Sequence, residues 1–134
     1  MNLHIDFPRL KKDLTELGAI GRTAEGGVSR PSFSEADMQA RRWLLDRIAA
    51  AGLASRMDAA GNIFARLGGD GPAVMVGSHL DTVPNGGTLD GALGVLAGLE
   101  CLRRIQEVGL PLRHPLELVA FTDEEGRFGG FFGS

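Results

Sequence analysis

Two short apolar segments, at residues 73–76 and 116–121, constrain the fold of this chain more than any other feature of its sequence. Neither segment alternates polar with apolar residues, which is typical of strands covered on both faces in the middle of an α/β sheet. Between them, residues 91–107 are apolar nearly all round at first and turn polar at Arg103 and Arg104, which predicts a helix with a buried first half. The order of segments favours an open, layered α/β sheet.

The N-terminal part adds two helices and a hairpin. Apolar residues repeat at three- and four-residue steps behind Asp6, which predicts a first helix that ends at Gly18. Ser34 is expected to cap a second helix that ends at Gly52. Residues 54–57 and 62–67 are short strand candidates joined by a turn-prone segment, which predicts a hairpin.

Composition narrows the class of protein. The 134 residues fit one small domain or part of one, and 43% hydrophobic and 23% charged residues are ordinary for globular proteins. The formal charge is −3, without a dense basic stripe, so nucleic acid is not an expected partner. No apolar stretch reaches the length of a membrane span, and no secretory signal is recognisable. A cytoplasmic protein is expected, with the single Cys101 as a small core residue.

Polar side chains follow both apolar strand segments. His79 and Asp81 come after the first segment, and Glu124 and Glu125 come after the second. In open α/β sheets, ligands bind outside the carboxyl ends of the strands. Imidazole and carboxylate groups suit several divalent cations, so this edge of the sheet is a candidate metal site.

The residue types also suggest separate roles. In extended backbone His79 and Asp81 point to the same side, so Asp81 is placed to orient the imidazole. Adjacent glutamates point to opposite sides if extended, which would let one bind metal while the other holds the attacking water. Asp90 follows a glycine-rich loop and is a candidate ligand between two cations. The pattern predicts a two-metal hydrolase.

Plainer interpretations exist for each residue taken alone. A histidine after a strand is often a hydrogen-bonded structural residue. Asp90 precedes a helix and would suit its N-cap. An acidic pair such as Glu124 and Glu125 is often a solvated edge. Their joint occurrence at the ends of two buried strands favours the metal site.

With these residues in place, the chain resembles the N-carbamoyl-amino-acid hydrolase and allantoate amidohydrolase branch of the aminoacylase/carboxypeptidase-like metallohydrolases. The resemblance covers nearly the whole chain. The motifs that carry it, in order, are Gly26-Gly27-Val28-Ser29-Arg30, Asp58-x-x-Gly61-Asn62, Gly77-Ser78-His79-Leu80-Asp81-Thr82-Val83, Gly86-Gly87-x-x-Asp90-Gly91-x-x-Gly94-Val95 and Glu124-Glu125-Gly126-Arg127-Phe128-Gly129.

The resemblance implies a layered α/β/α sheet of the zinc-dependent exopeptidase type and two divalent ions, zinc, manganese or cobalt. By position, His79 would bind one metal, Asp90 would bridge both and Glu125 would bind the second. Glu124 would be the general base, and Asp81 would orient His79. The implied reaction is hydrolysis of linear C–N bonds in small ureido acids such as N-carbamoyl amino acids or allantoate.

Family members are much longer than this chain. They carry an inserted lid domain that dimerises and two further histidine ligands, whereas His4 and His114 here match neither position. Residues 1–134 therefore correspond to the N-terminal portion of a catalytic domain. We expect weak or partial metal binding and little hydrolysis by this chain alone, and self-association through its Phe-rich residues 126–134. The full-length parent is expected to be an active homodimer.

Two alternatives remain open. One is a non-catalytic remnant that acts as a binding or assembly module, and the other is a related metallo-aminoacylase or peptidase. The DNA downstream of the Ser134 codon would separate fragment from remnant, because a fragment would continue with family-like sequence and a remnant would show an authentic stop.

Overall fold

A computed structural model describes residues 3–129 of the chain. Three helices and four strands make up the described part. In chain order they are α1 (Phe7–Ala19), α2 (Glu35–Ala50), β1 (Ala54–Met57), β2 (Ile63–Leu67), β3 (Val74–His79), α3 (Ala92–Glu107) and β4 (Leu116–Phe121). The predicted order of elements is confirmed.

Local chemistry explains where the first two helices start. The Asp6 side chain accepts a hydrogen bond from Arg9 N and caps α1, and Ser34 does the same for Asp37 N at the start of α2. Helix α1 continues through Gly18 to Ala19, because the residue with positive φ that turns the chain away is Gly21. The predicted stop at Gly18 was one residue early.

The strands form one mixed sheet in the order β1-β2-β4-β3. The hairpin of β1 and β2 is antiparallel, as predicted, and β2 pairs antiparallel with β4. β3 and β4 are parallel, with α3 as the connection between them. This β3–α3–β4 unit brings the carboxyl ends of both strands to the same edge of the sheet.

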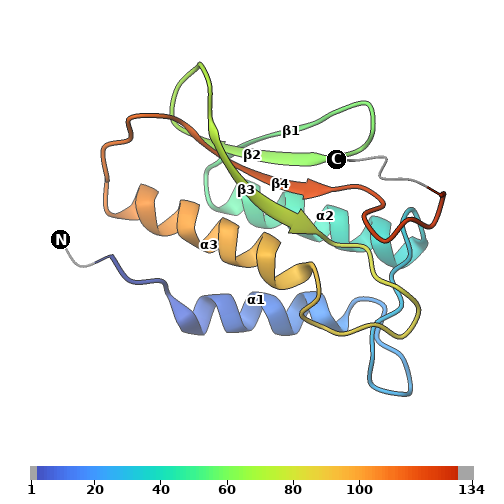
Figure 1. The fold of residues 1–134 in the computed structure, drawn as a ribbon. Helices are drawn as coiled ribbons and strands as arrows, with labels where there is room; N and C mark the ends of the chain where they lie inside the picture. The colour runs from blue at the N-terminus through green and yellow to red at the C-terminus, as the bar shows by residue number, and fades with distance from the viewer. Residues whose placement is uncertain (1–2, 130–134) are drawn as a thin grey trace.

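All three helices lie on one face of the sheet, with α3 between the sheet and α1 (Figure 1). Buried apolar residues of the strands and helices form one core on that face, which fixes the sheet against α2 and α3. A second layer of helices, on the opposite face, is not found among residues 3–129. The core residues include Leu17, Leu44, Ile48, Ile63, Val95, Leu99 and Leu118.

β3 differs from its prediction. It is an edge strand rather than a central one, and Val74, Met75 and Val76 are 53%, 47% and 43% exposed. Its sequence is that of a strand with neighbours on both sides, yet within residues 3–129 only β4 pairs with it. It also extends to His79, which therefore lies in the strand and not after it. β4, in contrast, has the predicted bounds and buried centre.

Helix α3 carries charges deeper in the structure than its sequence suggests. Glu100 is fully buried and Arg103 is 8% exposed, whereas Cys101, predicted to be a core residue, is exposed. The reason is that α1 packs across the polar side of α3. The two helices share a group of ion-paired residues, called here the helix charge cluster: Arg9, Asp13, Glu100, Arg103, Arg104 and Glu107.

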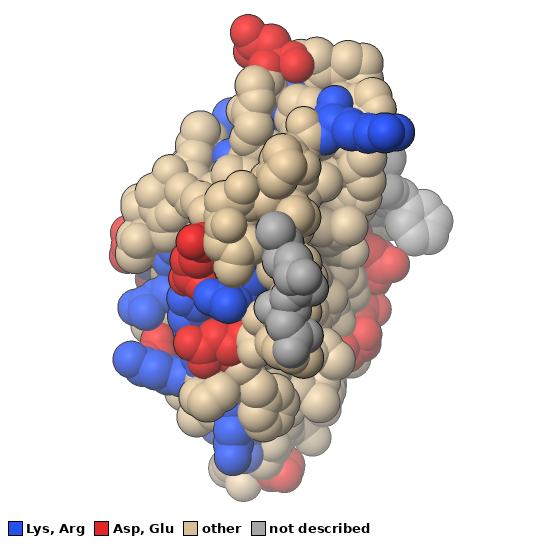
Figure 2. Space-filling view, turned by 90° about the vertical axis from the view of Figure 1, so that its left-hand side faces the viewer, with Lys and Arg blue, Asp and Glu red and all other residues tan. Residues whose placement is uncertain are grey.

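Figure 2 shows the face of the molecule near the start of α1 and the end of α3, where basic and acidic side chains lie side by side. None of the helices among residues 3–129 is long and apolar enough to cross a lipid bilayer. Of the Phe-rich terminal segment, Phe128 is 53% exposed and lies near Phe33, with ring centroids 6.1 Å apart. The rest of that prediction, on Phe131 and Phe132, falls outside the described residues.

Candidate metal centre

The site lies where β3 and β4 end together. His79 is the last residue of β3 and stands opposite Phe121, the last residue of β4. The chain after β4 then turns sharply at Asp123, a fully buried residue with a φ of 56°. The Asp123 carboxylate accepts hydrogen bonds from the N–H groups of Arg127 and Phe128 and so closes the turn that carries Glu124 and Glu125.

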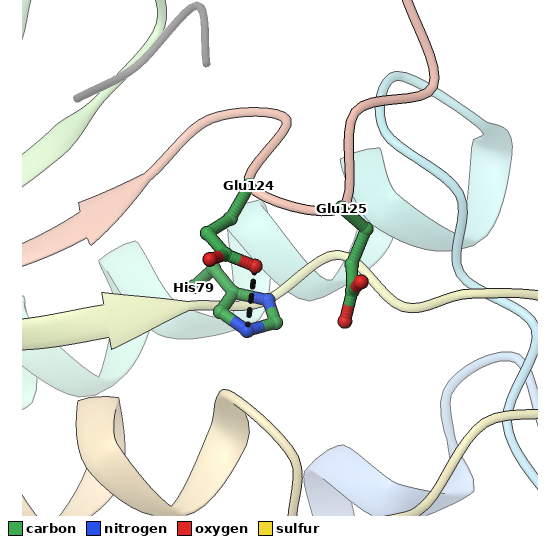
Figure 3. Close-up of side chains that lie close together, drawn as sticks. All are labelled: His79, Glu124 and Glu125. Carbon is green, nitrogen blue, oxygen red and sulfur yellow. Dashed lines mark ion pairs between the residues drawn. The ribbon is translucent and has the colours of Figure 1, made fainter. Parts of the chain in front are cut away.

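His79, Glu124 and Glu125 converge at this edge (Figure 3). One ligand atom from each lies within 4.8 Å of the others, and His79 Nε2 is 3.4 Å from Glu124 Oε2. The two glutamates lie in a turn and not in extended backbone, which allows both to approach the histidine. The sequence predicts opposite sides only for an extended backbone, and the backbone is not extended here.

Asp81 holds the His79 ring on its other side. His79 Nδ1 lies 2.8 Å from the carbonyl oxygen of Asp81 and 3.6 Å from the carboxylate Oδ1. A carbonyl oxygen can only accept, so Nδ1 carries a proton and donates it. In the neutral ring Nε2 is then the nitrogen with a free lone pair, and it faces Glu124 and Asp90.

The Asp81 carboxylate links the two strand ends. It is 2% exposed, and its Oδ2 accepts a hydrogen bond from Glu125 N at 3.1 Å. Its Oδ1 is buried with no hydrogen-bond partner within the described chain. Asp81 therefore orients the histidine mainly through its backbone and the glutamate turn through its side chain.

Asp90 lies close to the histidine but at the rim. Its Oδ1 is 3.9 Å from His79 Nε2, and its side chain is 67% exposed, outside the tighter group of three. It is not the N-cap of α3, because Gly91 has that position and makes no side-chain cap. Gly91 has a φ of 69°, and a Cβ there would lie 2.6 Å from His79 Nδ1, so the close approach of this loop to the ring requires glycine.

These five residues, His79, Asp81, Asp90, Glu124 and Glu125, form what we call the strand-end cluster. Within residues 3–129, no lysine or arginine forms an ion pair with its four carboxylates. Burial alone would lower the pKa of His79, but the oxygens of Asp81 and the charge of Glu124 outweigh it and raise the pKa to about 9. The surroundings of His79 Nε2 thus stabilise a positive charge at that atom.

Burial and neighbouring charges also shift the pKa values of two acids of the cluster, Glu125 and Asp81. Burial raises the pKa of Glu125, and the negative charges of Asp90 and Glu124 raise it further against the opposing effect of His79. Burial also acts to raise the pKa of Asp81, but the His79 ring and the Glu125 N–H outweigh it, and the pKa of Asp81 lies below its ordinary value. Excess negative charge around one imidazole is the electrostatic condition for binding a cation.

The donor atoms fit a divalent metal. Nitrogen and carboxylate oxygen bind zinc at about 2.0–2.2 Å, so two atoms on one tetrahedral ion lie about 3.4 Å apart. The separation of His79 Nε2 from Asp90 Oδ1, 3.9 Å, is close to this value. The arrangement is therefore suited to hold metal without large movement of the backbone.

Sequence reasoning missed the residues that support the glutamate turn. Arg41, 5% exposed, donates to Asp37, to the carbonyl of Gly61 and to Thr122 Oγ1. Asn62 accepts from Thr122 N at 2.8 Å. The motif Asp58-x-x-Gly61-Asn62 contains two of the residues that make these contacts, Gly61 and Asn62. The motif alone does not show that they contact Arg41 and Thr122.

Comparisons with known proteins identify the family of the chain. The model of peptidase family M28 matches residues 62–134, more than half of the chain. N-carbamoyl-L-amino acid amidohydrolase of Geobacillus stearothermophilus is 48% identical over an alignment of 131 positions, which covers 93% of this chain and 32% of that protein. Allantoate amidohydrolase of Bacillus subtilis is 38% identical over 82% of this chain and 27% of its own length.

A solved structure extends the similarity to the fold. An amidase of the hydantoinase/carbamoylase family from Burkholderia phymatum superposes with a TM-score of 0.90 at 44% identity, over 99% of this chain and 33% of that one. The chain thus spans about a third of the length of the proteins it matches. The resemblance inferred from the motifs is confirmed, and the chain belongs to peptidase family M28, with amidohydrolases of N-carbamoyl amino acids and of allantoate among its relatives.

Proposed function

We propose that residues 1–134 form the N-terminal part of the catalytic domain of a two-metal hydrolase of linear amide and ureido C–N bonds. In this assignment His79 would bind one ion, Asp90 would bridge both ions and Glu125 would bind the second. Glu124 is the general base, and Asp81 orients His79. The observation that carries the proposal is the convergence of His79, Glu124 and Glu125, with no ion pair to a lysine or arginine in the described part of the chain.

The chain's own residues would act as follows. The carbonyl of Asp81 keeps the Nδ1 proton in place, which leaves Nε2 as the ligand atom. The bound ions would supply Lewis-acid polarisation of the scissile carbonyl and a lower pKa for the attacking water. The Glu124 carboxylate would accept a proton from that water and return it to the nitrogen that leaves. Its 42% exposed side chain is free to reach a substrate.

The proposed substrates are small ureido acids, N-carbamoyl amino acids or allantoate, because relatives with those names match 93% and 82% of the chain. A hollow of about 250 Å³ beside Glu125, lined also by Thr82 and Arg127, offers room next to the site for part of a small molecule. A metallo-aminoacylase or peptidase is the runner-up, in line with the name of the matching family.

The assignment gives each ion two protein ligands, one of them shared, whereas catalytic zinc sites commonly have about three. We therefore expect the 134-residue chain to bind metal weakly and to hydrolyse ureido acids slowly or not at all. The full-length parent, an expected homodimer, would be active. Two tightly held metal ions together with ureidase turnover in this chain would contradict that expectation.

Titration of the purified chain with Co²⁺ alone, followed by visible absorption and calorimetry, tests the site. His79→Ala removes the only nitrogen ligand of the assignment and is expected to weaken binding by about tenfold or more. Glu124→Gln, which removes a base and not an assigned ligand, should leave the affinity within about threefold, well below the loss typical even of outer-shell partners.

Glu107→Gln is the matched control, because Glu107 is a partly exposed acid in the helix charge cluster, away from the site. Its Co²⁺ affinity should equal that of the wild type. Equal binding by wild type and His79→Ala would show that cobalt binds elsewhere and would refute the site. A loss with Glu124→Gln as large as that with His79→Ala would instead make Glu124 a ligand.

A further inference from the structure

Arg30 is the one charged residue of the Gly26-Gly27-Val28-Ser29-Arg30 motif, its side chain is buried, and the proposed reaction gives it no role. It is 1% exposed, and none of the carboxylates among residues 3–129 forms an ion pair with it. Burial lowers the pKa of Arg30, against the attraction of Asp37 and Asp81. A buried cation without an acidic partner is costly and needs another source of compensation.

The end of helix α1 supplies part of that compensation. Arg30 Nη1 donates to the carbonyl oxygens of Leu17 and Ile20, at 3.0 and 2.8 Å. These carbonyls lie at the C-terminus of α1, where the helix dipole places partial negative charge. Arg30 thus binds a helix end in the way that basic side chains stabilise helix C-termini.

The other side of the guanidinium holds the segment that carries the site. Arg30 Nε donates to the carbonyl of Leu80 at 2.8 Å, and Leu80 stands between His79 and Asp81. The backbone of Arg30 adds two more bonds to Thr82, one from Thr82 N to Arg30 O and one from Arg30 N to Thr82 Oγ1, each 2.9 Å long.

We propose that Arg30 is a positioning residue that clamps the segment from His79 to Thr82 to the end of α1 and so fixes the ring of His79. The inference rests on the proposed function, because it assigns Arg30 a task for that metal site. An arginine suits the task better than a lysine, since its planar group donates in two directions at once from fixed positions. Without the clamp, the Asp81 carbonyl that holds His79 Nδ1 would move.

The test compares Arg30→Lys and Arg30→Met with wild type, in the whole 134-residue chain. Arg103→Met is the matched control, because Arg103 is a similarly buried arginine, paired with Asp13 at 2.6 Å and remote from the strand ends. The readouts are Co²⁺ affinity, amide hydrogen exchange of Thr82 and thermal unfolding. Affinities are corrected for the folded fraction of each variant.

Arg30→Met is expected to bind Co²⁺ about tenfold more weakly and to speed exchange at Thr82, while amides of α2 keep their protection. Arg30→Lys should lose less, because an ammonium group still donates to some of the carbonyls. Arg103→Met should unfold at lower temperature with unchanged Co²⁺ affinity. If Arg30→Met does not fold, Arg30→Lys decides by the same measurements.

Unchanged Co²⁺ affinity and unchanged Thr82 exchange in the Arg30 variants would overturn the inference. So would equal losses of affinity in Arg30→Met and Arg103→Met, because the effect would then be general destabilisation. Absence of Co²⁺ binding in wild type would overturn the proposed function and, with it, the task of Arg30. Thr82 exchange would still show whether the clamp exists, which separates the two failures.

Discussion

The strand-end cluster and the helix charge cluster contain similar side chains in opposite balance. In the helix charge cluster, three arginines meet three acids, and every acid is paired: Arg9 with Glu100 at 2.8 Å, Arg103 with Asp13 at 2.6 Å, and Arg104 with Glu107. In the strand-end cluster, four carboxylates surround one histidine and no arginine pairs with them within residues 3–129.

The paired charges of the helix charge cluster stabilise the fold, whereas the unpaired charges of the strand-end cluster are available for a ligand. The hollow beside the helix charge cluster is larger, about 500 Å³, than the one beside Glu125, about 250 Å³. The volume of the hollow therefore favours a ligand site at the helix charge cluster. The balance of charges favours a ligand site at the strand-end cluster. We give more weight to charge, because paired acids have no remaining attraction to offer a cation, whereas unpaired ones do.

The largest expected effect is in the helix charge cluster. Glu100 is fully buried and accepts hydrogen bonds from Asp6 N and from two nitrogens of Arg9. Glu100→Gln removes the charge that compensates Arg9 and Arg103, and we expect it to lower the free energy of unfolding by about 3 kcal/mol. Urea denaturation followed by circular dichroism measures this. A loss below about 1 kcal/mol would mean that the pairing contributes no more than exposed ion pairs do.

A smaller loss of stability is expected from Gly91→Ala, next to Asp90 of the strand-end cluster. The new Cβ would lie 2.5 Å from the carbonyl oxygen of His79, at a residue with positive φ. Strain of this kind costs about 1–3 kcal/mol and should displace the His79 ring, so Co²⁺ affinity should fall as well. Gly109→Ala is the control, because Gly109 also has positive φ but open space around it. Equal Co²⁺ affinities in the two variants would show that contact with the ring is unimportant.

The smallest expected effects on stability come from substituting one acid in each cluster, Glu107 and Glu125. The pKa of Glu107 is lowered to about 2 by its hydrogen bonds with Arg9 and Arg104, so its charge stabilises the fold. The pKa of Glu125 is raised, so its charge opposes folding of the metal-free chain. Glu107→Gln should lower the free energy of unfolding at pH 7 by about 0.5 kcal/mol, and Glu125→Gln should leave it unchanged or raise it by a similar amount.

The pH dependence has a definite sign for Glu107. Its pKa is lower in the folded than in the unfolded chain, so its contribution is complete above about pH 4.5 and disappears as the pH falls to about 2. The difference between wild type and Glu107→Gln should therefore shrink over that range in urea titrations. A difference that stays constant from pH 7 to pH 2 would contradict the assignment of the stabilisation to this charge.

Local signals were enough to predict much of the fold. The Ser34 cap placed the start of α2, and the apolar segment from Leu116 to Phe121 gave the bounds of β4. The placement of His79 and the two glutamates at one edge of the sheet also followed from sequence, because both strands end there. The turn that brings both glutamates to the ring did not. The features that followed from sequence depend on neighbours in the chain or on a general rule of α/β sheets.

Other features depend on contacts between distant residues. The edge position of β3 is set by which strands pair with it, and its apolar sequence predicted the opposite. Burial of Glu100 and exposure of Cys101 follow from how α1 packs on α3. The bonds of Arg30 to Leu17 and Leu80 join segments far apart in sequence, so no local pattern reveals them.

The central claim is that the unbalanced charge of the strand-end cluster exists to bind a divalent metal. Anomalous X-ray diffraction from crystals of the chain soaked in Zn²⁺ tests it most directly. The account predicts a zinc peak about 2.0–2.2 Å from His79 Nε2, with a carboxylate oxygen of Asp90 beside it. A peak at the helix charge cluster, or no peak near His79 in crystals that bind zinc elsewhere, would contradict the claim.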